Sequence, residues 1–333
     1  MKTPWATARR SVRLHIVTGK GGTGKSTVAA ALALALASRG TNVLLCEVEG
    51  RQGIAQLFDV PPLPYEERRI AQGPVDGGEV YALAIDAESA MLEYLQLYYR
   101  LGRRTGGLLD RFGVIDFATT LAPGLRDVLL TGKVYEAVDR NSRNRHARVY
   151  DAIVLDAPPT GRIVQFLTVN GEFGDLAKVG MVRGQTEKVM RLLRSPRTAV
   201  HLVTVLEDMP VQETVDGIDE LRGHGFPIGG VVVNLTRPKE LDEARDQALA
   251  GTLPRAEIED QLLKAGVDVT PELMDGLLEE ALAHAERRQL EDEQRARIDE
   301  LGVETFELLR LPDGIDLGGL YELAEDFREQ GLA

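Results

Sequence analysis

Residues 14–27 read Leu-His-Ile-Val-Thr-Gly-Lys-Gly-Gly-Thr-Gly-Lys-Ser-Thr, and this stretch decides the fold. Its apolar start, residues 14–17, predicts a buried strand, and the alanine- and leucine-rich run over 28–37 predicts a helix. Between them, Gly19 is followed after four residues by Gly24-Lys25-Ser26, which is the P-loop pattern. A strand before the glycines and a helix after them argue against a chance turn.

The residue types of this loop suit a phosphate group. Glycines let the backbone turn its N–H groups toward phosphate oxygens, and the start of the next helix adds partial positive charge. We expect Lys25 to reach the β- and γ-phosphates and the Ser26 hydroxyl to bind Mg²⁺. The predicted nucleotide-binding residues here are Gly19, Lys20, Gly21, Gly22, Thr23, Gly24, Lys25, Ser26 and Thr27.

Composition limits the class of protein. A length of 333 residues allows two domains or one large α/β unit with an insertion, and 44% hydrophobic residues suffice for a normal core. The net charge of −13 argues against general nucleic-acid binding, so we expect no nucleic-acid partner. A single cysteine, Cys46, rules out a disulfide framework and a multi-cysteine metal site within one chain, and it suits a reducing cytosol.

The apolar runs point to a cytoplasmic protein. Residues 1–10 lack the apolar core of a signal peptide. The longest apolar run, over 28–37, is too short to cross a bilayer. We therefore expect no integral membrane segment.

Strand and helix patterns alternate along most of the chain. Further strands are predicted at 42–48, 80–85, 149–156, 201–206, 228–233 and 306–311. This alternation behind a P-loop predicts the α/β class, with a doubly wound, mostly parallel sheet and one P-loop domain over 1–333. Residues 88–147 have helical spacing and read as a helical insertion subdomain.

A second helical segment is predicted at 239–302, before the chain returns to the core at 303–333. It is mostly charged, with one apolar stripe made by Leu273, Leu277, Leu278 and Ala281. The insertion ends in a basic cluster of Arg140, Arg143, Arg145 and Arg148, which is either a solvated loop or a surface for an anionic partner.

A second motif follows the strand at 149–156. Residues 156–162 read Asp-Ala-Pro-Pro-Thr-Gly-Arg. An aspartate at the carboxyl end of a buried strand near a P-loop suits Mg²⁺, bound directly or through water, although Asp156 could also cap a helix. The glycine permits a loop that responds to a γ-phosphate. Arg162 is equally a phosphate contact or a loop cation.

These motifs together resemble a known family. Lys20 directly follows Gly19, and Lys-Gly-Gly-Thr-Gly-Lys-Ser resembles the deviant P-loop of the signature-lysine ATPases, which include MinD, ParA and ArsA. The heptapeptide at 156–162 is similar to the Asp-Thr-Ala-Pro-Thr-Gly-His switch II of the ArsA family, whose Get-type relatives target tail-anchored membrane proteins. The resemblance covers residues 14–325 and implies a SIMIBI-type fold, ATP and Mg²⁺ as cofactors, and a dimer in which Lys20 acts catalytically on the partner's nucleotide.

The resemblance extends to two nucleotide contacts. Glu207, six residues before Glu213-Thr214, resembles a family segment whose first glutamate lies near the nucleotide, with Leu206 where the family has proline. Asn234 ends a strand similar to the one whose asparagine reads the adenine, since an amide both donates and accepts. Without the resemblance, Asn234 is equally a turn residue.

The chain also departs from the family. Residues 49–53, Glu-Gly-Arg-Gln-Gly, stand where the family has Asp-Pro-Ala-His-Ser, whose aspartate positions the attacking water. We expect Glu49 to take this catalytic role, with Glu47 on the same strand face as its rival. The family's zinc clamp and arsenite site need several cysteines, so a lone Cys46 argues against both.

The leading interpretation is a dimeric, Mg²⁺-dependent ATPase whose turnover drives a switch for an unknown client. Its partner would be a second copy or a paralogous ATPase. Two alternatives remain: a MinD/ParA-like positioning switch, and a regulatory nucleotide-binding subunit with little turnover. MinD-like proteins need a basic amphipathic helix at the C-terminus, whereas residues 323–330 are acidic.

Overall fold

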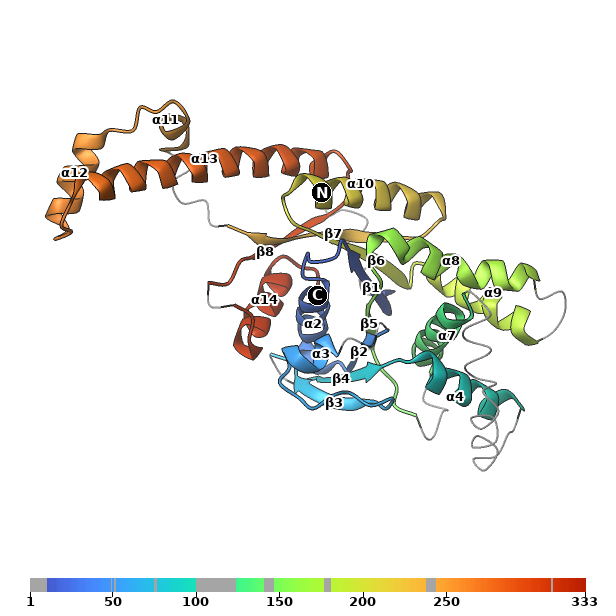
Figure 1. The fold of residues 1–333 in the computed structure, drawn as a ribbon. Helices are drawn as coiled ribbons and strands as arrows, with labels where there is room; N and C mark the ends of the chain where they lie inside the picture. The colour runs from blue at the N-terminus through green and yellow to red at the C-terminus, as the bar shows by residue number, and fades with distance from the viewer. Residues whose placement is uncertain are drawn as a thin grey trace.

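The computed structural model describes residues 11–48, 50, 52–74, 77–99, 124–140, 147–176, 181–237, 244–312 and 314–333. Its centre is an eight-stranded sheet in the order β3-β4-β2-β5-β1-β6-β7-β8 (Figure 1). The strands are β1 (Leu14–Gly19), β2 (Val43–Glu47), β3 (Arg68–Gln72), β4 (Glu79–Ala84), β5 (Ala152–Asp156), β6 (Thr198–Thr204), β7 (Ile228–Thr236) and β8 (Thr305–Leu309). Only β3 and β4 pair antiparallel, so the predicted mostly parallel α/β sheet is confirmed.

The central strands are apolar because both of their faces are covered. Every residue of β1, β2, β5 and β6 is buried, which explains their almost continuous hydrophobic sequences. β1 lies between β5 and β6, with Val17 opposite Asp156 and Gly19 opposite Val203. The loops that follow these three strands therefore meet at one edge of the sheet.

One face of the sheet carries α2 (Lys25–Leu36), α3 (Gly53–Leu57) and α14 (Leu317–Glu329). Five alanines between positions 29 and 35 of α2 let the helix lie close to the strands, and α14 packs over it. Leu320, Leu323 and Phe327 of α14 are almost completely buried there. The first and last long helices of the chain therefore share one apolar core.

The other face carries α7 (Leu125–Asp139), α8 (Thr160–Leu176), α9 (Met181–Leu193) and α10 (Asp208–Gly223). Within the segment predicted as an insertion, α4 (Ala87–Tyr99) packs on α7. Arg143 and Arg145 of the basic cluster lie outside the described residues. Arg140 is buried and is held by the carboxylates of Glu136 and Glu67, so at this position the cluster is part of an ion-pair network.

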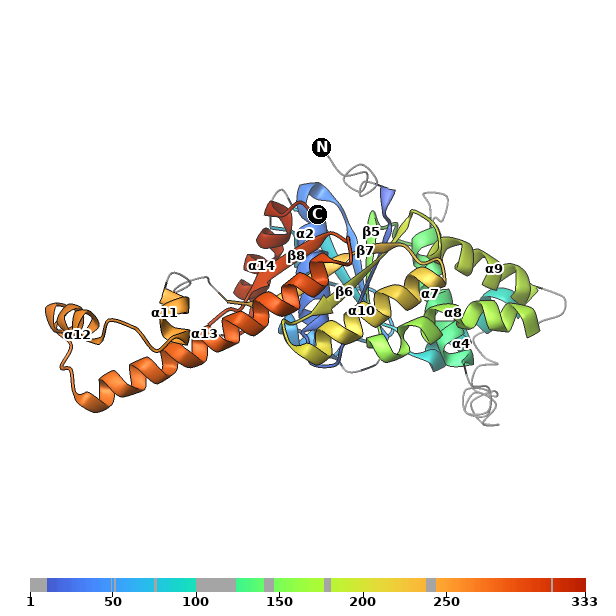
Figure 2. The same cartoon turned by 90° about the horizontal axis from the view of Figure 1, so that it is seen from above.

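Between β7 and β8 the described residues form three helices: α11 (Arg245–Leu249), α12 (Arg255–Lys264) and α13 (Pro271–Asp299). The end of α13 lies on the body beside α10, and α12 with the first half of α13 extends well beyond it (Figures 1 and 2). α13 begins with a clear signal, because Thr270 caps it through its side chain and Pro271 takes the first position. We call residues 255–286 the outer arm.

β3 and α8 are two of the elements that the sequence patterns did not predict. β3 reads Arg-Arg-Ile-Ala-Gln and is mostly exposed, because it is the antiparallel edge strand and needs no continuous apolar run. α8 starts inside the heptapeptide at 156–162 and continues through a sequence with three glycines. Among the described residues, no helix combines the length and the apolar character that a bilayer crossing requires.

Candidate nucleotide-binding site

The loop between β1 and α2 is held in a conformation that only glycine permits at two points. Gly19 has φ 155°, and a Cβ there would lie 2.2 Å from the carbonyl oxygen of Val203 on β6. Gly24 has φ 86°, and a Cβ there would lie 2.4 Å from Nδ2 of Asn234. The loop is thus pressed against β6 and β7, and larger residues at these positions would push it out of shape.

The mouth of this loop is open. Gly21 and Gly22 are exposed, and apart from the glycine itself and its chain neighbours no heavy atom of the described residues lies within 4 Å of the point where a Cβ would stand at either one. Gly24 precedes α2, and within the described structure no side chain caps that helix. Its first N–H groups therefore have no side-chain cap among the described residues, which fits a phosphate anion at the start of a twelve-residue helix.

Lys25 lies within the loop. It is the first residue of α2, it is 9% exposed, and its Nζ is 3.4 Å from the carbonyl oxygen of Lys20. Thr23 is buried and its hydroxyl donates to the same carbonyl oxygen at 2.8 Å. The cation is therefore directed to the inside of the glycine turn. Thr27 is half-buried on the next part of α2.

Oxygen ligands gather beside the loop. The Ser26 hydroxyl donates to Oδ2 of Asp156 at 2.6 Å, where β5 ends. Glu47, at the end of β2, lies opposite Asp156 in the sheet register and accepts from the backbone N–H of Gly53 at 2.9 Å. A Cβ on Gly53 would lie 3.5 Å from Oε1 of Glu47 and 3.8 Å from Oγ of Ser26. One hydroxyl and two carboxylates thus converge, and such hard oxygen donors suit Mg²⁺.

Glu47, the rival of Glu49 in the sequence, lies within this group of oxygen ligands. It is 3% exposed, and its carboxylate and the Ser26 hydroxyl both lie close to Gly53. The register of β2 with β5 brings Glu47 level with Asp156, and no signal in the local sequence reveals that register. Glu49 lies outside the described residues, so its expected role as the catalytic base stays a prediction.

Lys20 is engaged within its own chain. Its Nζ forms an ion pair with Oε1 of Glu213 on α10, and the Thr160 hydroxyl at the start of α8 donates to Oε2 of the same carboxylate at 2.9 Å. The hydrogen bond from Lys20 holds the pKa of Glu213 below its usual value. The P-loop, α8 and α10 are thereby joined at one carboxylate. We call this set of three residues the Lys20–Glu213–Thr160 junction.

The two residues taken from the resemblance lie in different surroundings. Asn234 is 5% exposed, and its Nδ2 donates to the carbonyl oxygen of Thr23 at 2.9 Å. Its amide therefore supports the back of the P-loop. Glu207 is exposed at the N-terminal cap of α10, shortly after β6 ends.

Arg162 links the loop after Asp156 to the helical layer. It lies in the first turn of α8, and its Nη2 is 3.5 Å from Oδ2 of Asp127 on α7. Burial raises the pKa of Asp127 above its usual value, although Arg162 opposes this. Both residues line a small cavity together with Val48 and Pro158, which follow β2 and β5. A movement of these loops would therefore alter the contacts of α7.

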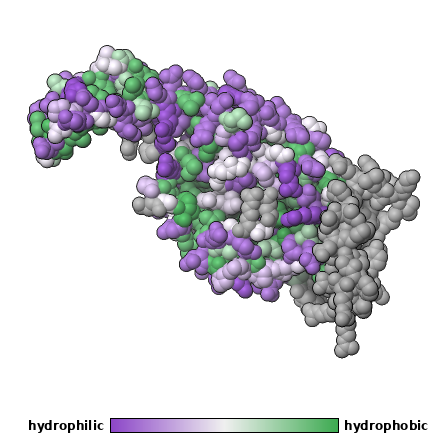
Figure 3. All heavy atoms as spheres, viewed as in Figure 1, coloured by the Kyte–Doolittle hydropathy of each residue, from purple (hydrophilic) through white to green (hydrophobic). Residues whose placement is uncertain are grey.

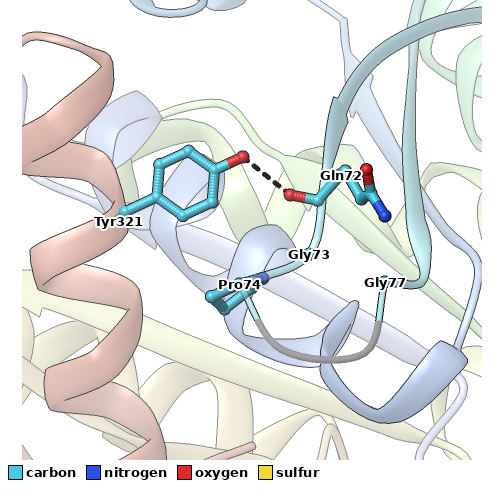
Figure 4. Close-up of a pocket in the computed structure, with 5 residues that line it drawn as sticks. All are labelled: Gln72, Gly73, Pro74, Gly77 and Tyr321. Carbon is cyan, nitrogen blue, oxygen red and sulfur yellow. Dashed lines mark hydrogen bonds between the residues drawn. The ribbon is translucent and has the colours of Figure 1, made fainter.

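A second depression lies at the other end of the sheet. It is lined by Gln72, Gly73, Pro74, Gly77 and Tyr321, between the turn that precedes β4 and helix α14 (Figure 4). The Tyr321 hydroxyl donates to the carbonyl oxygen of Gln72 at 2.7 Å and joins the two walls. Because ligands of open parallel sheets bind at the carboxyl ends of the strands, this depression has no part in the nucleotide site.

Comparisons with known proteins agree with this geometry. The model of the ArsA family, described as anion-transporting ATPase, matches residues 12–195. The ATPase BagA of Mycobacterium tuberculosis is 54% identical over 98% of this chain and 96% of its own length, and a putative ATPase of Mycobacterium bovis matches equally well. The arsenical pump-driving ATPase of Acidiphilium multivorum is 26% identical over 92% of this chain and 53% of its own length.

The resemblance to the ArsA family is thereby confirmed. The matched residues include the P-loop, the end of β2 and the loop after β5, which are the segments that converge in the structure. The chain belongs to the ArsA ATPase family and is an enzyme that hydrolyses ATP.

Proposed function

We propose that this protein is a Mg²⁺-dependent ATPase that works as a dimer and couples ATP turnover to a change of shape. The observation that carries the proposal is the convergence of Ser26, Asp156 and Glu47 beside an open glycine loop. Few arrangements other than a phosphate-bound Mg²⁺ site call for a hydroxyl and two carboxylates next to a helix N-terminus.

In this proposal each residue has a defined task. The backbone N–H groups of the loop and the Lys25 ammonium neutralise the β- and γ-phosphates. Ser26 and Asp156 hold Mg²⁺, directly or through water, and Glu47 orients that shell while it fixes Gly53. The bound ion would offset negative charge on the phosphate oxygens. Glu49 orients the water that attacks the γ-phosphorus as the bond to the β,γ-bridging oxygen breaks, which yields ADP and phosphate.

The proposed change of shape starts at the loop after Asp156. That loop runs directly into α8, whose first turn contacts α10 through Thr160 and Glu213 and α7 through Arg162 and Asp127. Loss of the γ-phosphate would release the loop, and these contacts would pass its movement to the helices at 88–147. We infer that an unknown client binds on that side, and that residues 88–147 act as a subdomain.

The dimer is supported by Lys20 and by one relative. Lys20 lies beside the phosphate cradle, but its Nζ is bound to Glu213 on the side of α10. We infer that it leaves Glu213 and serves the nucleotide of a second subunit, either a copy of this chain or a paralogue. The chain spans 53% of the arsenical pump-driving ATPase of Acidiphilium multivorum, so that relative is long enough for a second unit of this size.

α14 does not supply the membrane-binding helix of a MinD-type positioning switch. Such a switch needs a free amphipathic helix at the C-terminus that can enter a membrane surface. Here Leu320, Leu323 and Phe327 are the apolar face of α14, and all three are buried against the chain's own core.

Variants of the two lysines test the proposal. Lys25→Ala should weaken ATP binding to the single subunit, because the phosphates then face only backbone donors. Lys20→Ala should leave that affinity nearly unchanged and abolish hydrolysis, because its charge reaches the phosphates only when two subunits close and so acts on the transition state. Nucleotide affinity and phosphate release measure the two effects.

An experiment with mixed dimers of two variants gives the sharper test. In a mixed dimer of Lys20→Ala and Glu49→Gln chains, the Glu49→Gln subunit gives an intact Lys20 to the site that retains Glu49. Part of the activity should therefore return. If mixed dimers form and no activity returns, Lys20 acts within its own subunit and the proposed dimer mechanism is wrong.

A further inference from the structure

The outer arm has few buried residues. None of the ten residues of α12, all of which the structure describes, is buried. α11 packs along α13, where Ala248, Met274 and Ala285 are buried. Short helices in water are marginal unless an apolar face is packed. The structure therefore leaves α12 without the contacts that normally keep such a helix folded.

Large apolar side chains are exposed along this segment. Leu273 and Leu277 lie one turn apart on α13 and are 43% and 41% exposed. Leu263 on α12 is 56% exposed, and Val267 and Leu282 are also exposed. Half of the apolar stripe predicted from the sequence, Leu273 and Leu277, is thus open to solvent. Figure 3 shows hydrophobic and hydrophilic surface side by side on the arm.

The same segment is strongly acidic. Residues 255–286 contain nine aspartates and glutamates but only two basic residues, Arg255 and Lys264, a formal net charge of −7. Both basic residues already pair with aspartates of the arm, Arg255 with Asp275 at 2.6 Å and Lys264 with Asp260 at 2.5 Å. More than half of the excess negative charge of the chain therefore lies in about a tenth of its length.

We propose that the outer arm docks a cationic amphipathic helix of a partner protein. The exposed leucines supply an apolar contact of the i, i+4 type into which such a helix fits, and the surrounding carboxylates select lysine or arginine on its polar face. A second arm of the same chain is excluded as the occupant, because two segments of charge −7 would repel each other. This surface is remote from the nucleotide site and is independent of the function proposed above.

A binding experiment on the full chain tests this surface. The probe is a fluorescein-labelled synthetic helix, Leu-Lys-Lys-Leu-Leu-Lys-Leu-Leu-Lys-Lys-Leu-Leu-Lys-Leu, followed by anisotropy. We expect the chain to bind it, and the Leu273→Ser, Leu277→Ser double variant to bind about tenfold or more weakly, as for a central apolar contact. Leu317→Ser is the matched control, because Leu317 is 42% exposed on the body. The same peptide with glutamate for lysine should not bind.

Two further variants show whether the peptide binds the arm itself or any acidic surface of the protein. Glu279→Lys with Glu280→Lys should weaken binding, whereas Glu322→Lys with Glu329→Lys, on exposed positions of α14, should not. Hydrogen exchange should slow in 255–264 when the peptide is added. Equal losses in both charge variants would show attraction to any acidic surface and overturn the proposal. So would self-association of the free chain that the leucine double variant abolishes, because the occupant would then be a second copy.

Discussion

Two glutamates near the end of β2 illustrate the limits of reasoning at the scale of single residues. Alternation along a strand puts Glu47 and Glu49 on one face, and the sequence alone gave preference to Glu49. The structure shows Glu47 buried, level with Asp156 and close to Ser26. Local sequence identifies an acidic strand end, but which carboxylate lies level with Asp156 depends on the register of β2 with β5, a strand more than a hundred residues away.

Substitution of each glutamate should therefore impair ATP hydrolysis in a different way. Glu49→Gln should retain nucleotide and Mg²⁺ binding while turnover falls by about two orders of magnitude or more, the usual scale for a lost general base. Glu47→Gln should raise the Mg²⁺ concentration needed for half-maximal activity, because it alters the shell around Ser26 and Asp156. Steady-state hydrolysis measured against Mg²⁺ separates the two. A Glu49→Gln enzyme of normal turnover would move the catalytic role elsewhere.

At the scale of elements, the sequence predicted the buried strands and helix α2, and it missed elements that form only through contacts with their neighbours. Strands β1, β2, β5, β6 and β7 and helix α2 were found because their apolar runs need no context. α8 was missed because Gly161, Gly171 and several β-branched residues are poor helix formers. Ile163, Phe166 and Leu167 are fully buried, so tertiary packing holds this helix in place. The division of the chain at 88–147 and 239–302 stays a prediction.

The Lys20–Glu213–Thr160 junction joins three elements and invites a test. If Lys20 must leave Glu213 before two subunits close, then Glu213→Gln should ease closure. Both charged side chains are about a third exposed, and such pairs contribute about 1 kcal/mol or less, so dimerisation with ATP should strengthen by up to about fivefold per site. Sedimentation velocity on the Glu49→Gln background, where ATP persists, measures this shift.

Glu220→Gln is the control for that experiment, since Glu220 is exposed on the same helix. The dimerisation of the Glu220→Gln variant with ATP should equal that of the Glu49→Gln parent. If Glu213→Gln weakens the dimer, Glu213 assists Lys20 in the closed state and does not restrain it.

At the scale of the whole molecule, stability should depend on a buried histidine pair between β1 and β6. His15 and His201 stack with ring centroids 5.3 Å apart, and Nδ1 of His15 lies 3.1 Å from Nε2 of His201. Burial lowers the pKa of His15 to about 4. Because this folded-state pKa lies below that of the unfolded chain, the unfolded state binds more protons from about pH 6.5 down to about pH 4, and acid favours unfolding there.

Protonation of His15 in the unfolded chain should lower the free energy of unfolding by about 2 kcal/mol between pH 7 and pH 5. Urea unfolding at the two pH values should show it, and His15→Gln should reduce the difference by about that amount. His224→Gln, at an exposed position, should keep the parental pH dependence. An unchanged pH dependence in His15→Gln would mean that other groups, such as carboxylates, account for the acid sensitivity.

The packing of α14 on α2 has a consequence for how the protein is made. A ribosome releases the chain from its N-terminus, so α2 emerges with its outer face bare and waits for Leu320, Leu323 and Phe327. At the usual elongation rates of about 5–20 residues per second, that wait lasts about 15–60 s. During this time the nascent protein has its phosphate loop but lacks the helix that closes its core. Folding chaperones would meet the chain in this state, and a premature stop codon before residue 317 would make it permanent.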